Sequence, residues 1–78
     1  MEEIKQIKLN APEEVKDFVK AAEKCNFDID VFYNRFVVDA KSFLGVISLD
    51  LSRILNVTYR GFNSDFETII AKYSVMQS

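Results

Sequence analysis

The sequence predicts a single α+β domain, a two-layer sandwich in which helices cover one face of a small sheet. Two observations favour this class. Hydrophobic residues switch between a period of two and a period of 3.6 along the chain, in the order strand, helix, strand, strand, helix, strand, helix. The 78 residues, 49% of them hydrophobic and 28% charged, leave room for one modest core and no second domain.

The first third of the chain predicts one strand and one helix. The strand is expected over about residues 4–9, although Ile4 and Ile7 fall on opposite faces of it. The helix is expected over about residues 11–25, because Asn10 can cap its first turn and Glu13, three residues later, completes a capping box. Its apolar positions follow helical spacing: Val15, Phe18, Val19, Ala22 and Cys25.

The middle of the chain predicts a β-hairpin. Residues 27–33 alternate between apolar and polar side chains, as in a half-buried strand, and residues 36–40 form the returning strand. Asn34 and Arg35 lie between them. Because asparagine tolerates the positive φ that a tight hairpin requires, these two residues are the expected turn.

A helix is expected after Ser42. The run from Phe43 to Leu51 is apolar at more positions than one buried helical face can use. If Val46 and Leu49 point into the core, the remaining apolar side chains lie on another face of this helix.

A strand and a helix complete the prediction. Residues 55–59 alternate like a strand, and Gly61 ends it. Ser64, with Glu67 three residues later, predicts the start of the final helix. Its expected buried stripe consists of Phe66, Ile69, Ile70 and Tyr73.

The composition excludes several kinds of chemistry. The chain has no histidine, so Ser-His-Asp and Cys-His relays and a phosphohistidine are excluded. Its 12 acidic residues against 10 basic ones give a net charge of −2, which provides no electrostatic footprint for nucleic acid. The spacing of its carboxylates resembles no metal-binding motif. We therefore expect no catalytic residue, no metal site, no cofactor and no nucleic-acid partner.

The cellular compartment is predicted from the lone cysteine and from the N-terminal residues. A lone cysteine, Cys25, cannot form an internal disulfide and indicates a reducing, cytoplasmic compartment. Residues 1–5 are acidic where a signal peptide would be basic, and no apolar stretch approaches the length of a membrane span. We therefore expect a cytoplasmic protein that does not contact a membrane.

One segment resembles a known family. Residues 33–49 read YNRFVVDAKSFLGVISL, which is similar to the centre of the histidine-containing phosphocarrier (HPr) family of the bacterial sugar phosphotransferase system, close to YNGKKVNLKSIMGVMSL. The core of the resemblance is Lys41-Ser42-x-x-Gly45, between a hairpin and an apolar helix, and the resemblance covers most of the chain. It implies one HPr-like domain over residues 1–78, an open-faced sandwich with an antiparallel four-stranded sheet and helices on one face.

The family's phosphorylation motif is absent. GIHARPA should lie between the first strand and the first helix, where residues 9–14 read LNAPEE. Both the histidine and the following arginine are missing. Glu13 and Glu14 would repel an incoming phosphoryl group, so transfer through histidine is excluded.

Two features of the family have counterparts here. Ser42 matches the regulatory serine that a dedicated kinase phosphorylates in many Gram-positive bacteria; the alternative is that Ser42 acts only as a helix cap. Phe43, Leu44 and Ile47 match the exposed partner-binding patch of the family; the alternative is that the flanking chain or a second subunit buries them.

The resemblance therefore implies a non-catalytic regulatory or protein-interaction module related to the phosphoenolpyruvate-dependent sugar phosphotransferase system of a bacterium. The implied partner is a protein, either a serine kinase or a transcriptional regulator of sugar use, and the chain is a monomer or a weak homodimer. Two alternatives stay open: a phosphocarrier, as family membership would suggest, and an α+β domain that senses a small molecule.

Overall fold

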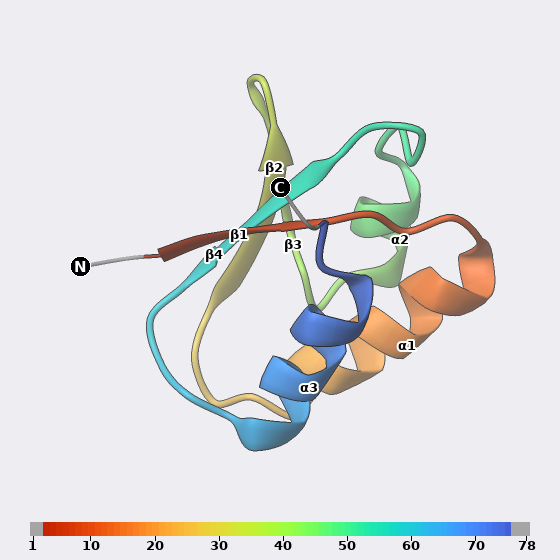
Figure 1. The fold of residues 1–78 in the computed structure, drawn as a ribbon. Helices are drawn as coiled ribbons and strands as arrows, with labels where there is room; N and C mark the ends of the chain where they lie inside the picture. The colour runs from red at the N-terminus through yellow and green to blue at the C-terminus, as the bar shows by residue number, and fades with distance from the viewer. Residues whose placement is uncertain (1–2, 76–78) are drawn as a thin grey trace.

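The computed structural model describes residues 3–75 (Figure 1). Met1 and Glu2, on which part of the signal-peptide argument depends, lie outside the described residues. The elements follow the predicted order. They are β1 (Glu3–Ile7), α1 (Pro12–Glu23), β2 (Ile29–Tyr33), β3 (Phe36–Asp39), α2 (Phe43–Ile47), β4 (Leu55–Tyr59) and α3 (Ser64–Tyr73).

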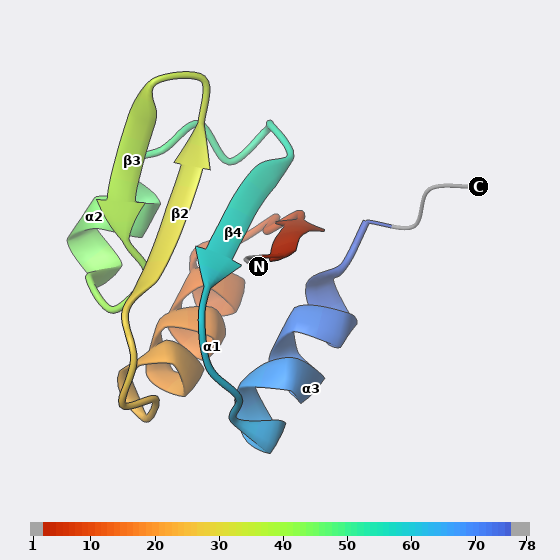
Figure 2. The same ribbon diagram turned by 90° about the vertical axis from the view of Figure 1, so that its left-hand side faces the viewer.

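The four strands form one antiparallel sheet in the order β1-β4-β2-β3. Figure 2 shows β3, β2 and β4 side by side, with the helices on one face of the sheet and the other face open. The architecture is therefore the predicted α+β open-faced sandwich. The predicted hairpin between β2 and β3 is also present, and Asn34 has the positive φ of 51° that its turn requires.

The core lies between the covered face of the sheet and the helices. Ile7 is fully buried whereas Ile4 is 60% exposed, as their opposite faces predict. The rings of Phe18 on α1 and Phe66 on α3 lie 5.8 Å apart and join the two long helices. The other fully buried large side chains are Leu9, Ile29, Leu55, Val15, Val31, Val46 and Val57.

The start of α1 differs from the prediction by one residue. The N-cap is Ala11, which makes no side-chain capping bond, and not Asn10. The side-chain oxygen of Asn10 accepts a hydrogen bond from Lys8 Nζ (3.0 Å), while its backbone N–H donates to Glu14 Oε1 (2.8 Å). The capping box with Glu13 is thus wrong, because Glu14 reaches back from the third helical position and Lys8 engages the asparagine.

The start of α3 is also displaced by one residue. Asn63 is the N-cap, and its Oδ1 accepts a hydrogen bond from the backbone N–H of Phe66 (2.9 Å). Ser64, the predicted cap, is the first helical residue. Glu67 does not complete a capping box, because its carboxylate accepts a hydrogen bond from the Tyr59 hydroxyl (2.6 Å) and so joins α3 to β4.

Gly61 and Gly45 differ in whether a larger side chain could replace them. Gly61 has a φ of +149°, and a Cβ there would lie 2.6 Å from Cγ of Phe27. A Cβ on Gly45 would lie 3.3 Å from Cβ of Val38, which a small shift can relieve. Backbone strain and a ring clash therefore combine at Gly61 but not at Gly45.

We predict that Gly61→Ala lowers the free energy of unfolding by about 2 kcal/mol or more. Gly45→Ala is the matched control. Its contact cost is offset by roughly 1 kcal/mol of helix propensity, so its net change stays within ~1 kcal/mol. Urea unfolding followed by circular dichroism measures both, and equal losses for the two variants would contradict the prediction.

Candidate functional site

The β1–α1 connection lies where the resemblance to the HPr family implies a phosphorylation motif. Lys8 Nζ donates to Asn10 Oδ1 (3.0 Å) and to the backbone carbonyl of Leu51 (2.9 Å). Leu9, Asn10 and Ala11 complete the connection to α1. None of these three side chains is a nucleophile, and the ammonium of Lys8 donates to two oxygens. The connection has no group that can accept a phosphoryl group as an imidazole does.

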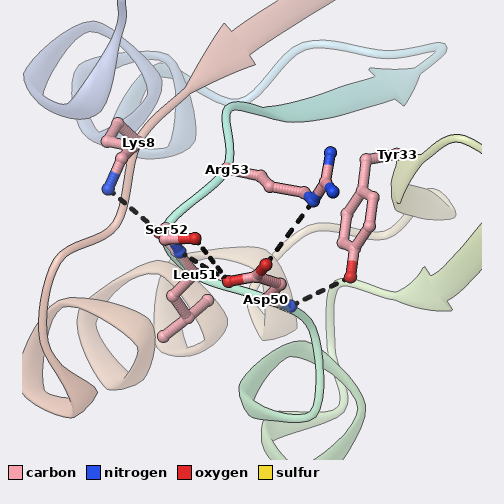
Figure 3. A network of polar contacts seen from close by, with 6 residues as sticks. All are labelled: Lys8, Tyr33, Asp50, Leu51, Ser52 and Arg53. Atoms are coloured by element: carbon pink, nitrogen blue, oxygen red, sulfur yellow. Dashed lines mark hydrogen bonds and ion pairs between the residues drawn. The ribbon is translucent and has the colours of Figure 1, made fainter.

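Lys8 also joins this connection to the α2–β4 connection (Figure 3). There, Asp50 Oδ1 accepts hydrogen bonds from the backbone N–H (3.1 Å) and the hydroxyl (2.6 Å) of Ser52. The Asp50 backbone N–H donates to the Tyr33 hydroxyl (3.1 Å), and the Arg53 guanidinium lies 5.4 Å from the centre of the Tyr33 ring. These contacts hold the connection that follows α2 against the end of the β2–β3 hairpin.

The Asp50 carboxylate stabilises a turn and is not poised for acid–base chemistry. Hydrogen bonds from Ser52, with a smaller contribution from Arg53, hold its pKa below the usual value for aspartate. The carboxylate therefore stays ionised near neutral pH and acts as an acceptor. The spacing Asp50-x-Ser52 is typical of an Asx turn, a signal that could have predicted this contact from the sequence.

Ser42 is the N-cap of α2, as one of its two predicted roles required. Its Oγ accepts a hydrogen bond from the Gly45 backbone N–H (3.1 Å), and the residue is exposed. The missing Cβ of Gly45 leaves room for this oxygen, since a Cβ there would lie 3.2 Å from it. The Lys41-Ser42-x-x-Gly45 spacing thus has a local physical cause: the serine caps the helix, and the glycine lets the cap and β3 approach.

The predicted apolar patch lies on α2 and comprises Phe43, Leu44 and Ile47, which we call the α2 patch. Leu44 is 78% exposed and Phe43 is 38% exposed. Ile47 is half-buried and packs against the core, so it contributes less to this surface than predicted. Val46 and Leu49 are buried, which fixes the outward direction of Leu44.

Phe43 connects the α2 patch to the start of α1. Its side chain lines a shallow groove of about 160 Å³ together with Pro12, Glu13 and Lys16. An apolar aromatic therefore stands beside one carboxylate and one ammonium. This arrangement, an apolar centre with a polar rim, is typical of protein-interaction surfaces.

A larger groove of about 530 Å³ lies between α1 and the end of α3. Asp17 Oδ2 accepts hydrogen bonds from the Tyr73 hydroxyl (2.8 Å) and from Lys72 Nζ (3.3 Å). The Tyr73 hydrogen bond is the main cause that lowers the pKa of Asp17. Most of the lining residues are charged, so this groove lacks the predominantly hydrophobic and aromatic side chains that the small-molecule alternative needs.

The fold and these sites were compared with known proteins. No protein-family model matches the chain, and no curated protein matches it significantly. The crystal structure of a phosphocarrier protein HPr from Bacillus anthracis str. Ames has a similar fold, with a TM-score of 0.69 and 23% sequence identity over 94% of this chain and 95% of that one. The chain therefore has an HPr-like fold. No helix within residues 3–75 is long and apolar enough to cross a membrane.

Proposed function

We propose that this chain is a non-catalytic regulatory module of the bacterial sugar phosphotransferase system that binds a protein partner through the α2 patch. The observation that carries the proposal is the 78% exposure of Leu44 on a helix whose phase is fixed by buried neighbours. Phe43, 38% exposed, precedes Leu44 on the same short helix, so the two side chains form a contiguous apolar surface, and such surfaces mark sites of protein association.

The β1–α1 connection supports a binding role over phosphate transfer. The protein with the similar fold is described as a phosphocarrier, and the resemblance assigns that activity to a histidine in this connection. Here the chain has no histidine, and Glu14 accepts the backbone N–H of Asn10 in the same place. The carboxylates of Glu13 and Glu14 disfavour the approach of a phosphate dianion.

We predict that Leu44→Glu weakens partner binding at least ~10-fold, because truncation of a central apolar anchor typically costs about 2 kcal/mol. The free energy of unfolding should change by less than ~0.5 kcal/mol, because the side chain is exposed. Leu44 is a sharper probe than Phe43, whose side chain is partly packed against α1.

The measurement is affinity capture from a lysate of the source organism, with the bound proteins quantified by mass spectrometry. Phe62→Glu is the matched control: Phe62 is 76% exposed on the β4–α3 connection, away from α2 (Figures 1 and 2). Proteins lost by Leu44→Glu and kept by Phe62→Glu are the partners of the α2 patch. Identical sets for wild type and Leu44→Glu would refute this role.

We further propose that a serine kinase phosphorylates Ser42 and thereby regulates the α2 patch. The hydroxyl is exposed and lies directly before Phe43 and Leu44. A phosphate there adds up to two negative charges at the border of an apolar surface. Phosphorylation of Ser42 would then control partner binding, and the phosphate would not be passed on to another molecule.

We predict that the family's serine kinase labels the wild-type chain and not Ser42→Ala, in an assay with radioactive ATP. Ser48→Ala is the matched control, because Ser48 is exposed at the other end of the same helix and its hydroxyl donates to the Gly45 carbonyl (2.6 Å). Labelling of Ser42→Ala, or an unlabelled wild type, would overturn this assignment.

A further inference from the structure

The two edges of the sheet differ in how they are covered. The outer edge of β1 is covered by the residues that follow α3, since Val75 N–H donates to the Gln6 carbonyl (3.0 Å) and Lys8 N–H donates to the Tyr73 carbonyl (2.9 Å). β3 is the other edge strand, and its neighbour in the sheet is β2. In Figure 2, β3 forms the outer border of the sheet with α2 behind its C-terminal half.

The register with β2 determines which backbone groups of β3 are free. Ala40 N–H donates to the Ile29 carbonyl (2.9 Å). At every second residue back along β3, Val38 is paired with Val31 and Phe36 with Tyr33. In an antiparallel pair, hydrogen-bonded and non-hydrogen-bonded pairs alternate. The N–H and C=O groups of Val37 therefore point away from β2, toward the open edge of the sheet.

The exposed side chains in the first half of this edge are apolar: Phe36 is 52% exposed and Val37 is 60% exposed. Natural edge strands avoid pairing with other chains through proline or charged side chains, and in residues 36–39 the only such residue is Asp39, at the end of the strand. The edge is thus apolar and has unpaired backbone groups at its centre.

The two ends of the β3 edge carry opposite charges. Arg35 precedes β3 and Asp39 ends it, and both are exposed. Neither has an ion-pair partner within residues 3–75. Asp39 lies opposite Asp30 of β2, and a nearby cation would reduce the repulsion between these two carboxylates.

We propose that two copies of this chain associate through antiparallel pairing of their β3 edges about a two-fold axis at Val37. In that register each Val37 exchanges both backbone hydrogen bonds with Val37 of the second copy. Arg35 of each copy lies opposite Asp39 of the other, and Phe36 lies opposite Val38. The pairing joins the two sheets into one and buries the exposed apolar side chains of both edges.

This interface is separate from the α2 patch and independent of the proposed function. Its expected area is small, because only four residues of each copy form the strand, so the association is weak. Sedimentation velocity from about 10 µM to about 1 mM should show the mean mass rising from one chain toward two. Leu44→Glu should associate like the wild type.

Two charge variants test the register. Arg35→Glu sets a carboxylate opposite the Asp39 carboxylate of the second copy, and Asp39→Lys sets an ammonium opposite the Arg35 guanidinium. Each variant alone should therefore raise the dissociation constant at least ~10-fold. In a heterodimer of the two variants, both cross-strand pairs are attractive again, so the equimolar mixture should associate about as strongly as the wild type. Circular dichroism checks that each variant is folded.

Val37→Pro provides a test that does not depend on charge. The variant removes an N–H that points away from β2, so the hairpin keeps its own bonds while the pairing is blocked. Asp39→Lys removes the carboxylate that accepts a hydrogen bond from Lys41 N–H (2.9 Å). If that variant does not fold, Val37→Pro decides the outcome.

Several results would overturn the proposal: a wild type that stays monomeric up to about 1 mM, self-association that Val37→Pro leaves unchanged, or charge variants whose mixture does not recover. Loss of self-association in Leu44→Glu would assign the contact to the α2 patch and equally overturn it.

Discussion

The burial of Val46 and the close approach of α2 to β3 at Gly45 together determine which side chains of α2 face solvent. A Cβ at Gly45 would stand 3.2 Å from the capping oxygen of Ser42 and 3.3 Å from Cβ of Val38, so helix, cap and strand are in contact at one residue. The helix is only five residues long, and with Val46 buried in the core, Leu44 is directed to solvent. Packing, and not hydrophobicity alone, determines which apolar side chain of α2 is exposed.

Polar contacts stabilise the surface beside α2 and engage the Lys8 ammonium and the Asp50 carboxylate. Lys8 bridges the two connections, and Asp50 is engaged by Ser52 and Arg53. In an HPr-like fold this region would carry the phosphate-accepting histidine, according to the resemblance. Here the fold is similar, and the chain has no histidine. Fold and activity are separable in this way because an activity depends on a few side chains that the core does not require.

Much of the fold could be predicted from the sequence, because it depends on local patterns. The hairpin turn at Asn34, the alternation of β4 and the cap at Ser42 each involve residues within a few positions of one another. The predicted cap at Ser64 was wrong because the neighbouring Asn63 side chain accepts the Phe66 backbone N–H, and the one at Asn10 because its side-chain oxygen accepts from Lys8 instead. Local propensity locates a helix end only to within a residue or two.

The candidate site was predictable in its residues and not in its geometry. The Phe43-Leu44 pair could be identified from an excess of apolar positions, but the half-burial of Ile47 depends on packing against the core. The covering of β1 by the chain after α3, and the open edge of β3, depend on strand order and register. Those are long-range properties that no local pattern encodes.

We propose that this HPr-like domain acts by binding and carries no transferable phosphate. Intact mass spectrometry tests it most directly, after incubation of the chain with phosphoenolpyruvate and the purified phosphotransferase enzyme I, with an HPr phosphocarrier in parallel as the positive control. We expect an unchanged mass for this chain while the control gains one phosphoryl group. A phosphoryl group on this chain, labile in acid and transferable to a sugar-specific acceptor, would show that the domain is a phosphocarrier.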